Sequence, residues 1–167
     1  QRLHQQLQDI RCTFKQYYKM DVTIAISDPG PVTLARKLYR DTLQCLNYRF
    51  YLDESGMITT EDTLHAGGLE GTFVLDEERL CMPVRSGHRN EAELALAEFV
   101  QELKRAQLSI DMTKSYVIQQ YVSLIRLTDP DQMQERYARI PEIAEMSTLQ
   151  AIQAFLEETV REITLRN

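Results

Sequence analysis

The chain has 167 residues, of which 43% are apolar and 26% charged, and it carries a net charge of −6. This composition is ordinary for a folded domain with an apolar core, and it excludes a disordered chain. The acidic balance argues against a domain that holds nucleic acid by neutralising its phosphates. The apolar runs are far shorter than the roughly 20 residues that a helix needs to cross a bilayer. We therefore expect no direct nucleic acid binding by this chain and no membrane partner.

The opening residues and the cysteines indicate the cellular setting. The sequence opens with "QRLHQQLQDI", without Met and without the charged and apolar leader of a secreted protein. This opening has a helical pattern, and we interpret the chain as a piece of a longer protein. The three cysteines, Cys12, Cys45 and Cys81, are widely spaced and odd in number. They are typical of reduced thiols rather than of a disulfide framework, which predicts a cytoplasmic location.

The N-terminal third of the chain predicts a helix, a strand and a second helix. Residues 2–18 repeat apolar side chains at intervals of three and four, as a helix does. "VTIAIS", residues 22–27, alternates β-branched and small residues and predicts a strand. The "DPGP" turn at residues 28–31 separates this strand from the second helix, which we expect over residues 33–52. A short extended "MIT" follows at residues 57–59.

The second helix contains the stretch richest in Tyr and Arg, "YRDTLQCLNYRFYL" at residues 39–52. One of its faces carries an apolar stripe formed by Ala35, Tyr39, Leu43, Leu46 and Phe50, and Leu34, Leu38, Cys45 and Leu52 widen it to one side. We interpret Tyr39 and Phe50 as core residues. Arg49 falls inside the stripe and needs either solvent or a buried partner. Tyr48 and Tyr51 point away from it and contact either a ligand or a neighbouring part of a longer protein, and we favour the neighbour.

Residues 61–74 predict a loop, because they contain three glycines and little periodicity. After the loop, helices are predicted over residues 75–84 and 111–127. Three pairs have the pattern of helix starts: Asn90 with Glu93, Asp129 with Pro130, and Ser147 with Gln150. The core positions expected on these helices are Ala92, Leu96, Phe99, Val100, Leu103, Val117, Ile118, Tyr121, Val122, Ile125, Leu149, Ile152, Leu156, Val160 and Ile163. The fold class is therefore α+β and predominantly α-helical, with a helix–strand–helix unit followed by a bundle of helical hairpins.

The spacings that catalytic and metal sites need do not occur in the sequence. His4, His65 and His88 are scattered, and no cysteine lies within four residues of them. "HAGGLEGTF", residues 65–73, lacks the Lys and the spacing of a phosphate-binding loop. The acidic pair Glu77–Glu78 is interpreted as solvated helix surface. We predict no catalytic residue, no metal site and no cofactor.

Residues 22–58 carry a resemblance to a known family. "VTIAIS" is similar to the "SIGVA"-type strand of GGDEF domains, and the next helix is similar to the one that follows there, with Phe50 in the place of a Tyr and Gly56 in that of a downstream Gly. "YRDTLQCLNYRFYL" resembles more closely the degenerate GGDEF-like middle domain of bacterial AraC-type two-component response regulators. The resemblance implies a partial GGDEF-like unit at residues 1–60 and a loop at residues 61–74. Residues 75–167 would then be a helical region leading toward a C-terminal DNA-binding domain.

The resemblance implies a regulatory, non-catalytic role. The implied partners are the receiver domain and the helix-turn-helix DNA-binding domain of the same full-length chain, and a homodimer is left open. The alternative is a domain that senses a small effector, and the candidate ligand or interface residues are Tyr39, Tyr48, Arg49 and Tyr51. A nucleotide cyclase is a third alternative. Its substrate and metal residues do not carry over, because only one helix precedes the strand and "GGLEG", residues 67–71, lies on the wrong side of it.

Overall fold

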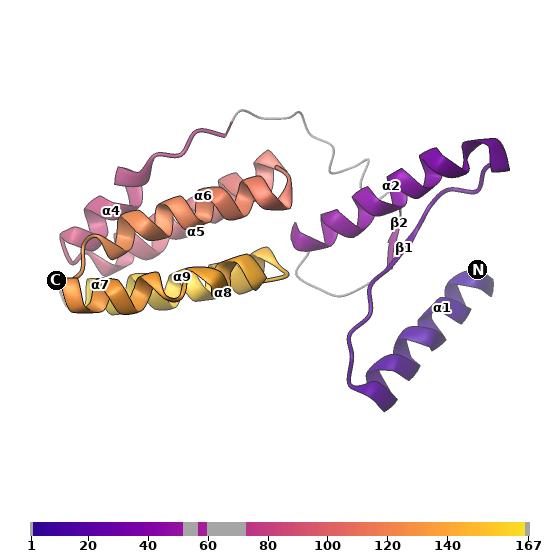
Figure 1. Cartoon of the computed structure of the whole chain (residues 1–167), viewed down its shortest axis with the longest axis horizontal. Coiled ribbons are helices and arrows are strands. Elements are labelled where there is room, and N and C mark those ends of the chain that lie inside the picture. The colour runs from indigo at the N-terminus through magenta and orange to yellow at the C-terminus, as the bar shows by residue number, and fades with distance from the viewer. Residues whose placement is uncertain (1, 52–56, 60–72, 166–167) are drawn as a thin grey trace. The chain divides into compact units, whose positions relative to one another are not determined.

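Helices dominate the structure, a computed structural model that describes residues 2–51, 57–59 and 73–165 (Figure 1). The chain divides into two compact units, Gln1–Gly67 and Gly68–Asn167. The first unit contains a small sheet with its helices, and the described part of the second is helical. The predicted α+β class with predominant helix is therefore confirmed. Most of the predicted loop of residues 61–74 lies outside the described residues.

The first unit begins with α1 (Arg2–Thr13), which continues into a π-helical turn at Phe14–Tyr18. The wider turn places the rings of Phe14 and Tyr18 5.5 Å apart. Lys19 ends the helix because its backbone is left-handed, with φ at 54°, and its N–H bonds back to the carbonyl of Phe14. No residue of α1 is buried. The predicted helix over residues 2–18 is confirmed.

A strand, a helix and a second strand form the rest of the first unit: β1 (Ile24–Ile26), α2 (Ala35–Tyr48) and β2 (Met57–Thr59). β1 and β2 pair in parallel, with Ala25 opposite Ile58. Parallel neighbours need a crossover connection, and α2 supplies it. The extended "MIT" is thus the partner of the "VTIAIS" strand, a pairing that the sequence pattern did not predict.

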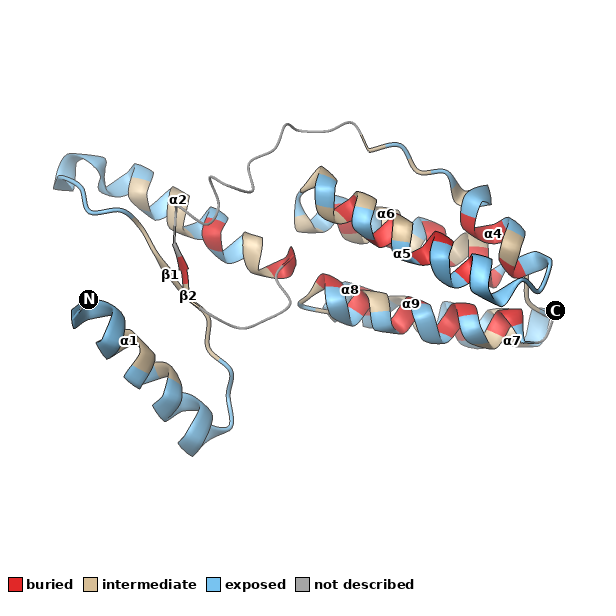
Figure 2. Cartoon of the chain, turned by 180° about the vertical axis from the view of Figure 1, so that it is seen from behind, coloured by how far each residue is buried: buried red, intermediate tan, exposed pale blue. Residues whose placement is uncertain are grey.

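The buried face of α2 lies along the side that Leu38 and Cys45 add to the predicted stripe, and not along the stripe itself. Cys45 is fully buried and Phe50 is 2% exposed, but Tyr39 is 67% exposed and Leu43 and Leu46 are about two-fifths exposed. The interpretation of Tyr39 as a core residue is therefore wrong, while that of Phe50 is confirmed. The buried face is centred one residue around the helix, about 100° away, because the short sheet lies on that side. Figure 2 shows α2 largely pale blue and tan, with red only toward its C-terminal end.

The second unit is a bundle of helices in two layers (Figure 1). Its elements are α4 (Glu77–Arg85), α5 (Arg89–Ala106), α6 (Ile110–Ile125), α7 (Pro130–Tyr137), α8 (Ile140–Glu145) and α9 (Leu149–Thr164). α4, α5 and α6 form one layer, and α7, α8 and α9 form the other (Figures 1 and 2). α5 packs against both α4 and α9, which also contact each other. The core therefore lies between the layers and around α5.

The side chains of this core are mostly those that helical periodicity predicted. All five predicted core positions of α5 and all five of α9 are buried. On α6, Val117, Tyr121 and Ile125 are fully buried, whereas Ile118 and Val122 are only half-buried. The buried face of α6 is therefore displaced toward Gln120 and Leu124, which are also buried.

Two of the predicted helix starts are displaced. Asp129 caps α7 with Pro130 in its first turn, as predicted. α5 begins at Arg89 after His88, so Asn90 lies inside the helix. α9 is capped by Thr148, whose side-chain oxygen accepts from the N–H of Ala151, and not by Ser147. Ser and Thr both accept this bond, so the next residue along could take the place of the predicted cap.

Shortening Leu103 tests the packing of α5. Leu103 is fully buried, so Leu103→Ala should lower the free energy of unfolding by about 2–5 kcal/mol, through lost burial and the cavity that remains. Leu94→Ala is the matched control on the same helix, because Leu94 is 62% exposed, and it should change stability by less than about 0.5 kcal/mol. Denaturant unfolding followed by circular dichroism measures both. Equal losses in the two variants would contradict the packing described for α5.

Candidate functional site

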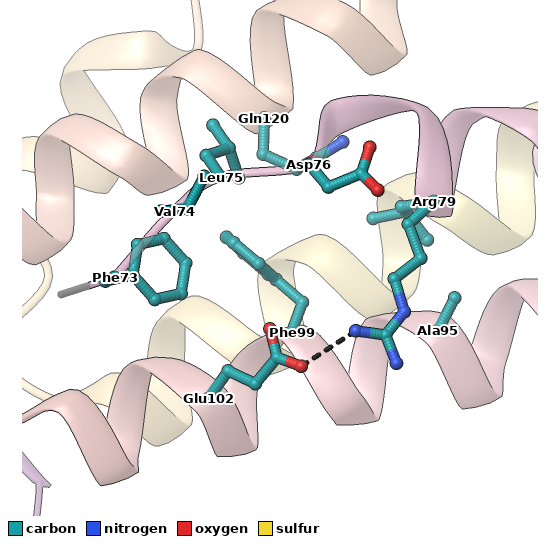
Figure 3. Close-up of a pocket in the computed structure, with 10 residues that line it drawn as sticks. Phe73, Val74, Leu75, Asp76, Arg79, Ala95, Phe99, Glu102 and Gln120 are labelled. Atoms are coloured by element: carbon teal, nitrogen blue, oxygen red, sulfur yellow. Dashed lines mark hydrogen bonds and ion pairs between the residues drawn. The ribbon is translucent and has the colours of Figure 1, made fainter. Parts of the chain in front are cut away.

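The second unit contains a pocket of about 90 Å³ where the chain enters α4 (Figure 3). Residues 73–76 form one wall, and side chains of α4, α5 and α6 form the others. The residues on which its chemistry depends are Phe73, Asp76, Arg79, Phe99, Glu102 and Gln120. Pockets for metabolites are usually several times larger, about 300–1,000 Å³, and an engineered cavity of about 150 Å³ in another protein holds one benzene molecule. This pocket can therefore take only a small chemical group.

An ion-pair network forms the polar side of the pocket. The guanidinium of Arg79 donates to Glu102 at 2.7 Å and to Glu98 at 2.6 Å, and both carboxylates come from α5. The hydrogen bond to Glu102 and the charge of Glu98 raise the pKa of Arg79 above its usual value. Figure 3 shows Arg79 reaching across from α4 to Glu102. Because all three side chains are about half exposed, the network orients Arg79 more than it stabilises the fold.

Aromatic rings form the other side. Phe73 lies edge-on to Tyr116 of α6 with ring centres 4.8 Å apart, and its ring centre is 6.2 Å from that of Phe99 of α5. Both distances are within the range of favourable ring contacts. Phe73 thus fixes the segment that enters α4 onto two helices of the second unit.

Gln120 also lines the pocket, and Cys81 lies next to it. Gln120 is 1% exposed, and its amide nitrogen donates to the carbonyl of Glu77 at 3.3 Å and contacts the sulfur of Cys81 at 3.7 Å. Burial raises the pKa of the Cys81 thiol to about 11. The thiol therefore stays protonated at neutral pH, which leaves it without the thiolate that a nucleophile needs.

Glu77 joins the start of α4 to α6. Its carboxylate accepts hydrogen bonds from Ser123 and from Gln119, the latter at 2.6 Å. The bond from Ser123, with that from Gln119, lowers the pKa of Glu77 below its usual 4.5. The interpretation of Glu77 as solvated surface is wrong, because its partners lie 42 and 46 residues further along the chain.

A second polar cluster lies where α6, α7 and α9 meet. Arg136 is 7% exposed and donates to Glu162 at 2.9 Å, and its backbone carbonyl accepts from the hydroxyl of Tyr121. Arg139 places its guanidinium 4.6 Å from the ring centre of Phe155. These contacts link helices through one buried cation, which is a packing role.

The predicted ligand or interface residues belong to the first unit, and none of them is among the residues that line this pocket. Tyr39 is exposed, Tyr48 and Arg49 are half-buried, and Tyr51 is 5% exposed. Tyr51 packs edge-to-face on Phe50 with ring centres 5.1 Å apart, so its ring does not point outward as expected. The role of these four side chains in binding stays a prediction.

The pocket residues have no motif that the sequence analysis could use. Asp76 and Arg79 lie three residues apart at the start of α4, but Glu102 lies on α5, and each is an ordinary surface residue type. The signal that could have found the pocket is a pair of Phe residues, Phe73 and Phe99, each followed three residues later by an acidic residue. That signal gains meaning only once α4 and α5 are known to pack together.

Two kinds of feature are absent from the residues that the structure describes. No helix within residues 2–51 and 73–165 is both long enough and apolar enough to cross a membrane. Across the described part of the chain, no group of three or more His, Cys, Asp or Glu side chains is placed to hold a metal ion. Comparison with known proteins found no matching family model, no matching curated protein and no matching solved structure.

Replacing the Glu77 carboxylate by an amide tests the link between α4 and α6. Glu77→Gln should lower the free energy of unfolding by about 1–3 kcal/mol at pH 7, because hydrogen bonds to a charged acceptor are lost. Since the folded protein holds the Glu77 pKa below 4.5, the unfolded chain binds this proton more tightly. The stabilisation should therefore be complete above about pH 4.5 and disappear as the pH falls through the folded-state pKa.

Thermal unfolding of wild type and Glu77→Gln, followed from pH 7 down through the acid range, measures this difference. Glu135→Gln serves as the control, because Glu135 is an exposed side chain on α7. A Glu77→Gln effect that stayed constant across this range would contradict the role given to the carboxylate.

Proposed function

We propose that this chain is a non-catalytic signal-coupling module of a bacterial AraC-type response regulator. In this role it links a receiver domain on its N-terminal side to a helix-turn-helix DNA-binding domain on its C-terminal side. The observation that carries the proposal is the resemblance of residues 22–58 to the degenerate GGDEF-like middle domain of these regulators. The division of the chain into two compact units, one of them a helical bundle, supports it.

The proposed mechanism is a shift between two packings of the helical unit. Residues 73–76 lead into α4, and Phe73 holds them against α5 and α6. A change transmitted along the chain from the N-terminal side reaches the helical unit through this segment. It would alter the contacts of Phe73 first, and then those of Glu77 at the start of α4. α4 is therefore the element whose packing such a change would bias.

Exposed side chains of the first unit supply a surface for neighbouring domains under this proposal. Tyr39 of α2 is exposed together with Leu43 and Leu46 on the same helix. Exposed apolar patches of this kind often mark contacts with another domain or subunit. Tyr39 is therefore the predicted interface residue that best fits the proposed role.

Hydrogen exchange in the full-length protein tests the coupling. Phosphorylation of the receiver domain should change the rate of amide hydrogen exchange in α4 by at least about threefold. The reason is that the free energy of opening a docked helix depends on its packing contacts. Exchange in the central turns of α9, which packs in the core, should stay constant. A full-length variant that lacks the phosphoacceptor aspartate of the receiver is the matched control.

Unchanged exchange in every helix, or a full-length chain that has no receiver domain, would refute the proposal. Light scattering of this chain over a hundredfold range of concentration then separates the two routes of coupling. A mass that rises with concentration places a dimer contact within these residues, whereas a constant mass leaves repacking within one chain.

A further inference from the structure

We propose that the pocket beside α4 binds a small organic ammonium ion, such as a methylated amine. The inference rests on the pocket of about 90 Å³ lined by residues 73–76, α4, α5 and α6 (Figure 3). It goes beyond the coupling role and does not depend on it, because the argument uses only the second unit.

The charges around the pocket favour a cation. Asp76 and Glu102 line it, and Glu98 stands next to Glu102, so three carboxylates face the single guanidinium of Arg79. Arg79 is already bound to two of them, which disfavours a second anion at this place. The three carboxylates and the one guanidinium together leave a negative charge, and Asp76 is the carboxylate that Arg79 does not bind, so a ligand that meets it must be positive.

Asp76 is free to meet such a ligand. It is the residue that precedes α4 and occupies the N-cap position, yet its side chain makes no capping hydrogen bond. Figure 3 shows its carboxylate on the same side of the pocket as Arg79, above the ring of Phe99. A carboxylate in that position can accept a hydrogen bond from an N–H of a ligand or balance a quaternary charge.

The aromatic side chains favour an ammonium over a metal cation. Phe73 and Phe99 line the pocket from different elements, and Tyr116 supports Phe73 from behind. Ring faces attract organic cations, and aromatic rings combined with acidic groups are a recurrent way to recognise methylated ammonium groups. Two phenyl rings offer no lone pair to a metal ion.

The side chain of Gln120 and the volume of the pocket also favour a small ammonium group. Both contacts of Gln120 within the fold use its amide nitrogen, so its oxygen is left able to accept from a ligand N–H. The volume is below that of a benzene site, so only part of a methylated ammonium group lies inside the pocket, next to the exposed carboxylate of Asp76, and a nucleotide or sugar is excluded.

Nuclear magnetic resonance of the whole chain, titrated with tetramethylammonium chloride, tests the proposal. The aromatic signals of Phe73 and Phe99 and the methyl signal of Ala95 should shift and saturate, with half-saturation at about 1–50 mM, as expected for so small a ligand. Sodium chloride at equal concentration should cause no saturable shift at these signals. Tert-butanol, which has a similar size but no charge, should bind at least about threefold more weakly if the charge is recognised.

Two variants decide whether Asp76 provides the recognition. Asp76→Asn should weaken tetramethylammonium binding at least about threefold, because the unpaired carboxylate is lost. Asp129→Asn is the matched control, since Asp129 is the N-cap of α7 and also lacks a capping hydrogen bond, and it should bind as wild type does. Shifts that never saturate, equal binding by Asp76→Asn and wild type, or equal binding of tert-butanol would each overturn the proposal.

Discussion

The packing of α5 against α4 and α9 is the constraint on which the second unit depends. Ala92, Leu96 and Leu103 are almost completely buried along this helix, and Ala92 has no side chain beyond its β-carbon to hold a neighbour away. Close approach on both sides removes apolar surface from water over the whole length of α5, which is the main favourable contribution to folding. The layers of the bundle, the position of α4 and the pocket all follow from this packing.

Polar contacts then determine how α4 sits on that core. Glu77 binds α6, and Arg79 binds α5, so the first turn of α4 is held from two directions. Phe73 adds an aromatic contact just before the helix begins. Small Ala95 on α5 leaves the space that these side chains surround. The pocket is therefore a consequence of helix docking, and the groups around it are held in place by contacts that also fix α4.

The first unit is built with much less burial. Its described core consists of Cys45, Phe50, Tyr51 and Ile58, and its parallel strands have three residues each. Parallel sheets are usually covered on both faces, and a two-stranded sheet is marginal without further packing. Apolar side chains of α1 and α2 meanwhile remain exposed. Such a unit has surface available for the neighbouring domains that the proposed coupling role requires.

The sequence by itself determined most helices of the second unit and the buried faces of α5 and α9, because the 3.6-residue period of a helix is set by local spacing. The core of α5 and α9 and the start of α7 at Asp129 could be predicted in this way. Only the tertiary structure decided which face of α2 is buried, which strand pairs with β1, and that Glu77 meets Ser123. The strand pairing joins residues 33 positions apart and the Glu77–Ser123 contact residues 46 positions apart, and an amphipathic pattern does not specify what packs against it.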